Sequence, residues 1–385
     1  MLPLDDRFRE RVAADPMGYS NSIEGLQVGR CGSTPIAYAH FRDSFPFTGR
    51  LLVVEMRSGD AWVITPFLAS RPMPSAITRE FDIAVIGAGV SGLSAAWQCA
   101  ERGASVICID AGGVPGGLIA NVGKLDGFPS VTPLSGAALA DSMVQACQAL
   151  DVSFLTAVVS SLAHTDSKTI LSTDQGAIGA KAVIVASGSR LLQLGVPGET
   201  EFAGRGVSQC DWCDGGFFKN ESVLVVGGGD AAFQAALHLA QVCASVTIVM
   251  RSSTIKARRA YVKSAADNAR IAFAWDTVVE RINGTDRVET VVLNHLAESC
   301  KEVHPTSGVF VFIGTAPNSE FLPAEVERDR SHLIVTDANY RTTLAGLYAI
   351  GGVRSGYRGQ VLSACGEGAA AAAASMNDLE TREMM

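Results

Sequence analysis

The sequence predicts an α/β fold with two Rossmann-like domains. The chain has 385 residues, which is too long for one ordinary hydrophobic core and suits two or three domains. Glycine is abundant at 39 residues, apolar residues reach 48% and charged residues only 18%, which is typical of buried parallel strands joined by tight turns. At two places, residues 81–100 and 223–242, an apolar strand run enters a glycine turn and then an apolar helix pattern.

Charge and cysteine usage limit the classes of function. The net charge of −8 argues against a nucleic-acid or anionic-membrane partner. The nine cysteines are an odd number, and the first residues, MLPLDDRFRERVAADP, are charged where a secretory leader would be apolar. No apolar run approaches the roughly 20 residues that span a bilayer. We therefore expect a cytoplasmic protein with reduced structural thiols.

Residues 1–80 carry no motif that identifies a ligand. Two apolar runs, 51–55 and 61–64, flank the sequence RSGD at 57–60, which is a hairpin signal. Residues 71–74, RPMP, have the composition of a linker. We expect a small N-terminal extension of unknown role.

The first nucleotide-binding signal lies in residues 81–110. A β-branched run enters the turn GAGVSG at 87–92, apolar residues then recur at helical spacing, and a second strand ends at Asp110. The glycines let the backbone approach a pyrophosphate, the helix N-terminus supplies N–H donors, and Asp110 can accept from a ribose hydroxyl. Together these features predict a dinucleotide site, whereas the turn alone could be a glycine-rich α/β turn.

Glycine-rich segments follow this unit. The sequence GGVPGGLI at 112–119 could lie against a flat ring or could be a surface loop. A buried strand at 182–185 ends in the small-residue turn Ala-Ser-Gly at 186–188, and residues 194–199 have the composition of a crossover linker.

The second unit places two thiols beside a nucleotide turn. Cys210 and Cys213 form a CxxC pair, and the apolar run 223–226 enters a second glycine turn at 227–229. A CxxC pair is a redox motif, and it can also be half of a zinc site. Because no second CxxC or close Cys/His pair accompanies it, we expect no metal site.

The residues after the next strand favour NADPH over NADH. The strand at 245–250 does not end in an acid, and Arg251 and Lys256 follow it. An acid would suit the free 2′-hydroxyl of NAD, whereas cations suit a 2′-phosphate. Arg258 and Arg259 are nearby, and for these two a solvated helix face is the better interpretation.

The C-terminal part returns to apolar strand runs, at 308–314 and 346–353. The alanine run 369–374 predicts a helix, which we expect the glycines at 366 and 368 to open. The N-terminal end of this helix could face a ring that becomes anionic on reduction, or the helix could be a plain surface helix.

Taken in order, these segments resemble the low-molecular-weight thioredoxin reductases. The likeness covers residues 81 to about 376, and CxxCD followed by a strand and GGGD is a specific signature. The resemblance implies an FAD-binding domain made of residues 81–193 and 302–385. It also implies an NADPH-binding domain at 194–301, inserted in the first and carrying the CxxC pair. Homodimers, and a rotation that brings the dithiol and the nicotinamide in turn beside the flavin, are further implications.

The resemblance also implies roles for individual residues. Cys213 looks like the thiol that exchanges electrons with the flavin, Cys210 like the thiol that attacks the substrate disulfide, and Asp214 like the proton donor and acceptor. The implied FAD-binding residues are Gly87, Gly89, Val90, Ser91, Gly92, Asp110, Gly116, Gly117, Leu118, Ala186, Ser187, Gly188, Gly352, Val353, Gln360 and Val361. The implied NADPH-binding residues are Gly227, Gly229, Asp230, Ala231, Arg251 and Lys256.

Several positions depart from the family pattern. Gly352 stands where the family has an aspartate that holds the flavin ribityl chain, and an extra residue precedes Gln360. Because of Gly352 we expect weaker binding of FAD, by about 1 to 3 kcal/mol for the lost ribityl hydrogen bond. Ser252 replaces one of two arginines, so we also expect weaker binding of NADPH. The spacer Asp211-Trp212 is bulky and acidic where small residues are common, so the partner could be a thioredoxin-like protein or a small-molecule disulfide or dithiol.

Three functions remain open at this point. The first, which we predict, is an FAD-dependent disulfide oxidoreductase that passes electrons from NADPH to the Cys210/Cys213 pair and on to a disulfide. The second is a flavin dithiol oxidase that uses O2, which the reduced set of cations favours and the intact turn at 227–230 opposes. The third is a degenerate, non-catalytic flavoprotein or binding module in which Gly352 has cost the flavin.

Overall fold

The computed structural model describes residues 79–384, apart from 126–127, 130–133 and 166–167, together with four strand backbones nearer the N-terminus. The chain divides into two compact units, Met1–Ser75 and Ala76–Met385. Within the described residues, no helix is both long enough and apolar enough to cross a bilayer.

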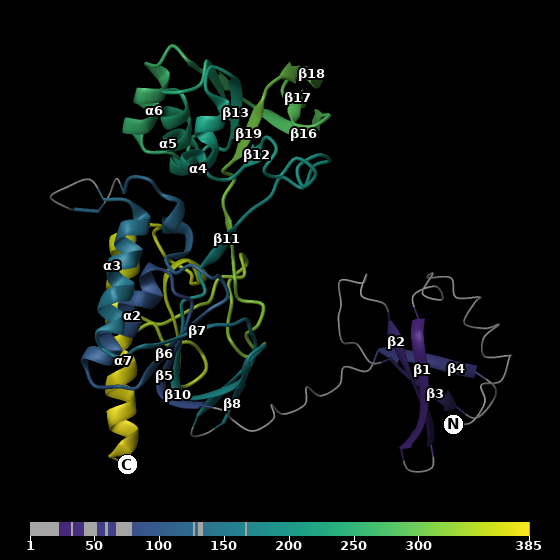
Figure 1. Ribbon diagram of the computed structural model, residues 1–385, viewed down its shortest axis with the longest axis vertical. Helices are drawn as coiled ribbons and strands as arrows, with labels where there is room; N and C mark the ends of the chain where they lie inside the picture. Colours follow the sequence, from purple (N-terminus) through teal and green to yellow (C-terminus); the bar gives the residue numbers. More distant parts are fainter. Residues whose placement is uncertain are drawn as a thin grey trace. The chain divides into compact units, whose positions relative to one another are not determined.

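The first unit contains a four-stranded antiparallel sheet with the strands in chain order (Figure 1). The strands are β1 (Ile23–Cys31), β2 (Thr34–Phe41), β3 (Leu52–Arg57) and β4 (Ala61–Pro66). Strands β3 and β4 pair from Leu52 with Pro66 to Arg57 with Ala61, so the hairpin expected over residues 51–64 is present. The linker expected at 71–74 lies outside the described residues.

A seven-stranded sheet organises the larger part of the second unit, in the order β7-β6-β5-β10-β9-β8 with β21 paired to β10. The strands are β5 (Arg79–Ile86), β6 (Val106–Asp110), β7 (Ser153–Thr156), β8 (Val159–His164), β9 (Thr169–Thr173), β10 (Gly176–Val185) and β21 (Leu347–Ala349). Strands β5, β6, β7, β10 and β21 run parallel, so their carboxyl ends meet at one edge of the sheet. In open α/β sheets this edge is where ligands bind.

Both faces of this sheet are buried, which explains its continuous apolar runs. Ile83 and Val85 pack under α2 (Val90–Glu101), α3 (Gly136–Gln148) and α7 (Val361–Glu383), which cover one face (Figure 1). Ala84 and Ile86 point to the other face and pack with residues from the C-terminal segment, among them Ile334.

Helix α7 corrects one expectation. Its N-cap is Gln360, so Gly366 and Gly368 lie inside the helix and do not open it. A Cβ on Gly368 would come within 2.8 Å of the Ser94 Cβ on α2. The glycine is therefore needed for the close approach of α2 and α7.

The inserted domain has a second parallel sheet, of five strands in the order β12-β19-β13-β14-β15. The strands are β12 (Val207–Ser208), β13 (Ser222–Val226), β14 (Ser245–Val249), β15 (Ile271–Ala274) and β19 (Gly308–Val311). One face packs on α5 (Asp230–Leu239) and α6 (Arg259–Ala266). The other packs on a three-stranded antiparallel sheet of β16 (Thr277–Gly284), β17 (Val288–His295) and β18 (Cys300–Pro305).

Two short antiparallel strands, β11 (Ser189–Leu191) and β20 (Thr315–Pro317), join the two domains. The chain leaves the first domain through β11 and returns through β20 (Figure 1). The predicted architecture is thus confirmed: two Rossmann-like α/β domains, the second inserted in the first, follow a small N-terminal extension.

Candidate active site

The first glycine turn joins β5 to α2 at the carboxyl edge of the larger sheet. Gly87 has a φ of +109°, which glycine adopts readily, and a Cβ there would collide with the backbone of Ala186. Gly89 is the N-cap of α2, and no heavy atom lies within 4 Å of where its Cβ would stand. The backbone at Gly89 is therefore open at a helix N-terminus, which is an arrangement that binds phosphate.

Asp110 ends β6 beside this turn. Its Oδ2 accepts a hydrogen bond from the N–H of Ala88 at 2.6 Å, and its Oδ1 accepts one from the N–H of Gly112 at 2.8 Å. Each carboxylate oxygen has a second lone pair, so the fixed carboxylate can still accept from a ribose hydroxyl.

The glycine cluster at 112–119 lies across the first turn. The N–H of Gly116 donates to the carbonyl of Ala88 at 2.7 Å, and Gly116 forms a bridge with Gly89. Gly117 opens the 3-10 helix η2 (Gly117–Asn121), and Leu118 on it is 46% exposed. The segment is held against the nucleotide turn, which favours the ring-side interpretation over a free surface loop.

Segments from far along the chain meet at the same edge. A Cβ on Gly92 would lie 3.2 Å from the Ala186 Cβ, next to the Ala-Ser-Gly turn. A Cβ on Gly351, which has a φ of +69°, would lie 2.5 Å from Ser91 Oγ. Gly351 opens the 3-10 helix η4 (Gly351–Val353), and Gln360 and Val361 then begin α7.

A buried carboxylate accepts a hydrogen bond from the first residue of η4. Glu367 is 8% exposed, and its Oε2 accepts from the N–H of Gly351 at 2.7 Å and lies 3.4 Å from Arg354 Nε. Burial raises the pKa of this carboxyl, against the lowering effect of the Gly351 N–H and of Arg354. Together the glycine turns, the fixed Asp110 and this cradle of small residues fit a dinucleotide.

The second glycine turn repeats the arrangement in the inserted domain. Gly227 has a φ of +145° and a Cβ there would collide with the carbonyl of Phe312, while Gly229 is the N-cap of α5. Asp230 and the exposed Ala231 open that helix.

A basic loop folds back over this second turn. The N–H of Lys256 donates to the carbonyl of Gly228 at 3.0 Å, and the side chains of Lys256 and Arg251 are exposed. Arg258 does not lie on a solvated helix face as we expected. It is the N-cap of α6, and it holds Asp230 through its N–H at 2.7 Å and its Nε at 2.8 Å.

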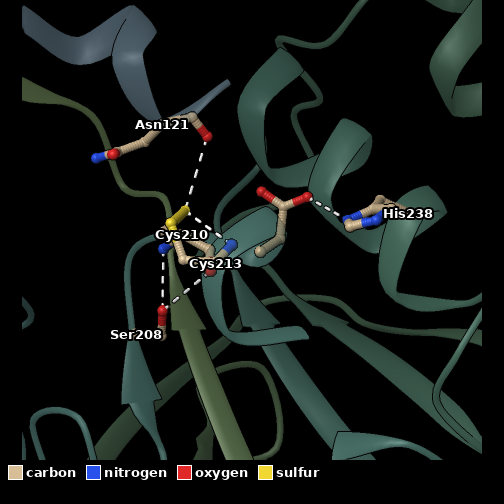
Figure 2. The surroundings of a disulfide bond; sticks show 6 residues. Asn121, Ser208, Cys210, Cys213 and His238 are labelled. Carbon is tan, nitrogen blue, oxygen red and sulfur yellow. Dashed lines mark hydrogen bonds and ion pairs between the residues drawn. A yellow bond between two sulfur atoms is a disulfide. The ribbon is translucent and has the colours of Figure 1, made fainter. Parts of the chain in front are cut away.

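Cys210 and Cys213 form a disulfide across the single turn of α4 (Asp211–Asp214), with their Cα atoms 5.3 Å apart (Figure 2). Cys210 Sγ accepts from the N–H of Cys213 at 3.1 Å, and the N–H of Cys210 donates to Ser208 Oγ at 3.0 Å. A sulfur that accepts an N–H is better able to carry the negative charge of a thiolate. Cys210 is half-buried and Cys213 is exposed.

Sequence reasoning missed the side chains and carbonyl that surround this pair. Cys210 Sγ lies 3.7 Å from the carbonyl oxygen of Asn121, at the end of η2 (Figure 2). His238 on α5 stacks on Trp212 with ring centroids 3.9 Å apart, and its Nδ1 lies 2.8 Å from Asp211 Oδ2. The sequence signal for His238 was a histidine on a mostly apolar helix.

Asp214, the predicted proton donor and acceptor, ends the turn α4 that carries the disulfide. In the described part of the chain no hydrogen bond joins its carboxylate to either sulfur. It lines a cavity of about 200 Å³ with Arg205, Arg287 and the exposed Phe217. In this conformation Asp211 is hydrogen-bonded to His238, whereas Asp214 lies apart from that pair.

Two of the free cysteines lie in the core, where their thiols are unreactive. Cys99 and Cys147 are fully buried, and burial raises the pKa of Cys99 to about 12 and that of Cys147 to about 11. Such thiols stay protonated at neutral pH and are poor nucleophiles.

Comparison with known proteins agrees with this geometry. The sequence profile of the pyridine nucleotide-disulphide oxidoreductases matches residues 81–368. A thioredoxin reductase of Treponema pallidum is 35% identical over 303 residues, which cover 78% of this chain and 98% of that protein. A thioredoxin reductase of Peptoclostridium litorale is 35% identical over 299 residues, which cover 76% and 95%.

Solved structures are similar over the same region. Lactococcus lactis thioredoxin reductase in its FR conformation has a TM-score of 0.75 and 30% identity, covering 78% of this chain and 99% of that chain. T. acidophilum thioredoxin reductase has a TM-score of 0.74 and 31% identity with the same coverage.

Proposed function

The chain belongs to the pyridine nucleotide-disulphide oxidoreductase family, and from that membership we propose that it reduces the disulfide of a thioredoxin-like protein. It is an FAD-dependent disulfide oxidoreductase in which electrons from NADPH reach the Cys210/Cys213 pair. The observation that carries the proposal is this disulfide, set on a helical turn of the domain that holds the second glycine turn. FAD, when bound, takes up two electrons from the nicotinamide and passes them to a disulfide.

In this proposal residues 81–193 and 302–385 bind FAD. The turn at 87–92 receives the diphosphate on open backbone, and Asp110 accepts from a ribose hydroxyl. The segments 116–118, 186–188, 352–353 and 360–361 enclose the rest of the cofactor. The convergence of the first three of these segments at the carboxyl edge of one sheet supports this assignment.

Residues 194–301 bind NADPH in the same way. The turn at 227–229 and the start of α5 face the diphosphate, and Arg251 and Lys256 bind the 2′-phosphate as cations. Asp230 holds the loop that carries Lys256, since it is paired with Arg258. No role is proposed for the N-terminal extension, residues 1–80.

Substrate reduction is a thiol–disulfide exchange. The Cys210 thiolate attacks one sulfur of the substrate disulfide, a mixed disulfide forms, and the other substrate sulfur leaves as a thiolate. Cys213 then attacks Cys210 Sγ, which restores the Cys210–Cys213 disulfide and releases the second substrate sulfur. The substrate gains two electrons from the dithiol and two protons, one from the Cys213 thiol as it attacks and one that Asp214, on the same turn, supplies. The N–H that Cys213 donates to Cys210 Sγ supports Cys210 as the attacking thiol.

A thioredoxin-like protein is the proposed partner because the relatives that match most of this chain are named for that activity. We also propose a cytoplasmic homodimer, without nucleic-acid or membrane partners. The acidic net charge of −8 supports the last point. Light scattering on the purified protein should give twice the chain mass of 40.3 kDa.

An anaerobic titration tests the function. NADPH should bleach the flavin absorbance of the purified protein, and the same concentration of NADH should do so more slowly. Added thioredoxin disulfide should then restore the yellow colour. If dithiols bleach the flavin and NADPH does not, the result would support the dithiol oxidase instead. A protein that stays colourless after FAD is added would support a non-catalytic binding module.

A further inference from the structure

Ser189 lies near the proposed FAD site, and its hydroxyl has no hydrogen-bond partner among the described residues. It opens β11 directly after the Ala-Ser-Gly turn and is half-buried. Its Oγ makes no hydrogen bond with any residue that the structure describes. The hydroxyl of Ser187, two residues earlier, is by contrast already donated to the carbonyl of Asn318 at 2.7 Å. Of these two hydroxyls, only that of Ser189 still has its proton available to donate to a ligand.

The same hydroxyl stands next to the empty side-chain position of Gly352. A Cβ on Gly352 would lie 3.2 Å from Ser189 Oγ and 3.7 Å from the Cα of Gly188, and the first distance is tighter than ordinary van der Waals contact. A larger side chain at 352 and a hydroxyl at 189 would therefore compete for one space. This sequence has the hydroxyl and leaves 352 without a side chain.

The two residues lie where the FAD-binding segments meet. Gly351, next to Gly352, rests against Ser91 of the first glycine turn. Ala186, at the start of the turn that leads to Ser189, rests against Gly87 and Gly92. Ser189 and Gly352 are therefore close to the first glycine turn, which is the proposed site of the FAD diphosphate.

We propose that the Ser189 hydroxyl binds the polyhydroxylated chain of FAD, in the place of the aspartate that the family resemblance implies at the position of Gly352. A serine hydroxyl can both donate to and accept from an alcohol, so it suits a polyol, and it carries no charge that must be desolvated. This inference rests on the proposed FAD site and adds to it a binding residue that departs from the family pattern.

A double-mutant cycle tests the inference, with the Kd of FAD for deflavinated protein measured by quenching of flavin fluorescence. Ser189→Ala should raise Kd about five- to tenfold, the loss of one neutral hydrogen bond. Gly352→Asp should improve binding at least about threefold more in the Ser189→Ala background than in the wild type, because the carboxylate then has room. Ser245→Ala, whose hydroxyl bonds Ser222 in the other domain, is the control and should leave Kd unchanged.

Several outcomes would overturn the inference. A Kd for Ser189→Ala within about twofold of the wild type would do so, and so would additive effects of the two substitutions. The deflavinated Ser189→Ala protein should melt at the wild-type temperature, and earlier melting would show that the hydroxyl has a structural partner instead. If the proposed function itself were wrong, the wild-type protein would bind no FAD, which is a result distinct from those above.

Discussion

The two sulfurs of the disulfide have different surroundings although they are three residues apart. Cys210 is half-buried, faces the Asn121 carbonyl and accepts an N–H, whereas Cys213 is exposed. An anionic sulfur is stabilised by N–H donors, so the N–H that Cys210 accepts supports the proposal that Cys210 is the attacking thiolate, whereas the Asn121 carbonyl oxygen does not. The roles at the residue scale are therefore separable by substitution.

Replacing Cys213 by serine should separate cofactor reduction from substrate reduction. Cys213→Ser should keep bound FAD and its bleaching by NADPH, while disulfide turnover falls by at least about 100-fold, because the internal disulfide cannot form. Steady-state turnover and anaerobic absorbance measure the two properties. Cys300→Ser, at an exposed free cysteine, is the matched control. Surviving disulfide turnover in Cys213→Ser would refute the relay.

At the scale of elements, the dithiol turn α4 contacts the segment that follows η2. A Cβ on Gly123 would collide with the indole of Trp212, whose other face stacks on His238. The unusual spacer Asp211-Trp212 thus contacts α5 through a hydrogen bond and a ring stack, and it lies close to Gly123. We therefore expect the spacer to position the disulfide relative to the segment around Gly123, through contacts that small residues could not make.

A substitution at Gly123 tests this contact. Gly123→Ala should displace the Trp212 ring and lower disulfide turnover about three- to tenfold, and the effect should vanish in a Trp212→Ala background. Gly113→Ala, which meets no atom within 4 Å in the same domain, is the control. Equal losses with and without Trp212 would show that the contact does not position the dithiol.

Helix α7 is anchored to the larger sheet by one carboxylate. Asp378 accepts from Arg341 Nε and NH2 at 2.8 Å each and from the hydroxyl of Tyr348 on β21. The hydrogen bonds from Arg341 hold the pKa of Asp378 below its ordinary 3.8, although burial opposes this. Because the folded pKa is depressed, the stabilisation is complete above about pH 4 and is lost as the pH falls through the lower folded value.

Asp378→Asn should therefore destabilise the protein in a pH-dependent way. We expect a loss of about 2 kcal/mol in the free energy of unfolding at pH 7, since charge-assisted hydrogen bonds become neutral ones. Urea unfolding at pH 7 and at successively lower pH should show the difference from wild type shrinking below pH 4. Asp141→Asn, on the exposed side of α3, should show no such trend. A difference that stays constant with pH would contradict the assignment.

At the scale of the whole molecule, the chain divides at residue 75, and every residue proposed for catalysis or cofactor binding lies in the second unit. Strands β5 and β21 come from opposite ends of this unit and share β10 as a neighbour. The second unit therefore contains a complete nucleotide-binding sheet.

A truncated chain of residues 76–385 should fold and retain function. We expect FAD binding and NADPH-dependent flavin bleaching within about twofold of the full chain, because no site residue is removed. Fluorescence titration and anaerobic absorbance measure both. Loss of FAD from a truncated protein that keeps its circular dichroism would show that the extension contributes to the cleft.

The sequence by itself determined the α/β class, both glycine turns, the CxxC pair and the family resemblance. These follow from local patterns, since strand–turn–helix chemistry is set by residues close together along the chain. Only the tertiary structure showed that α7 begins at Gln360, that Arg258 pairs with Asp230, and that Asn121, His238 and Ser189 lie at the sites. Arg258 and Asp230 are 28 residues apart in the sequence. Ser189 and Gly352 are much farther apart. Side-chain distances across segments depend on how the sheets bring the segments together, which no local pattern encodes.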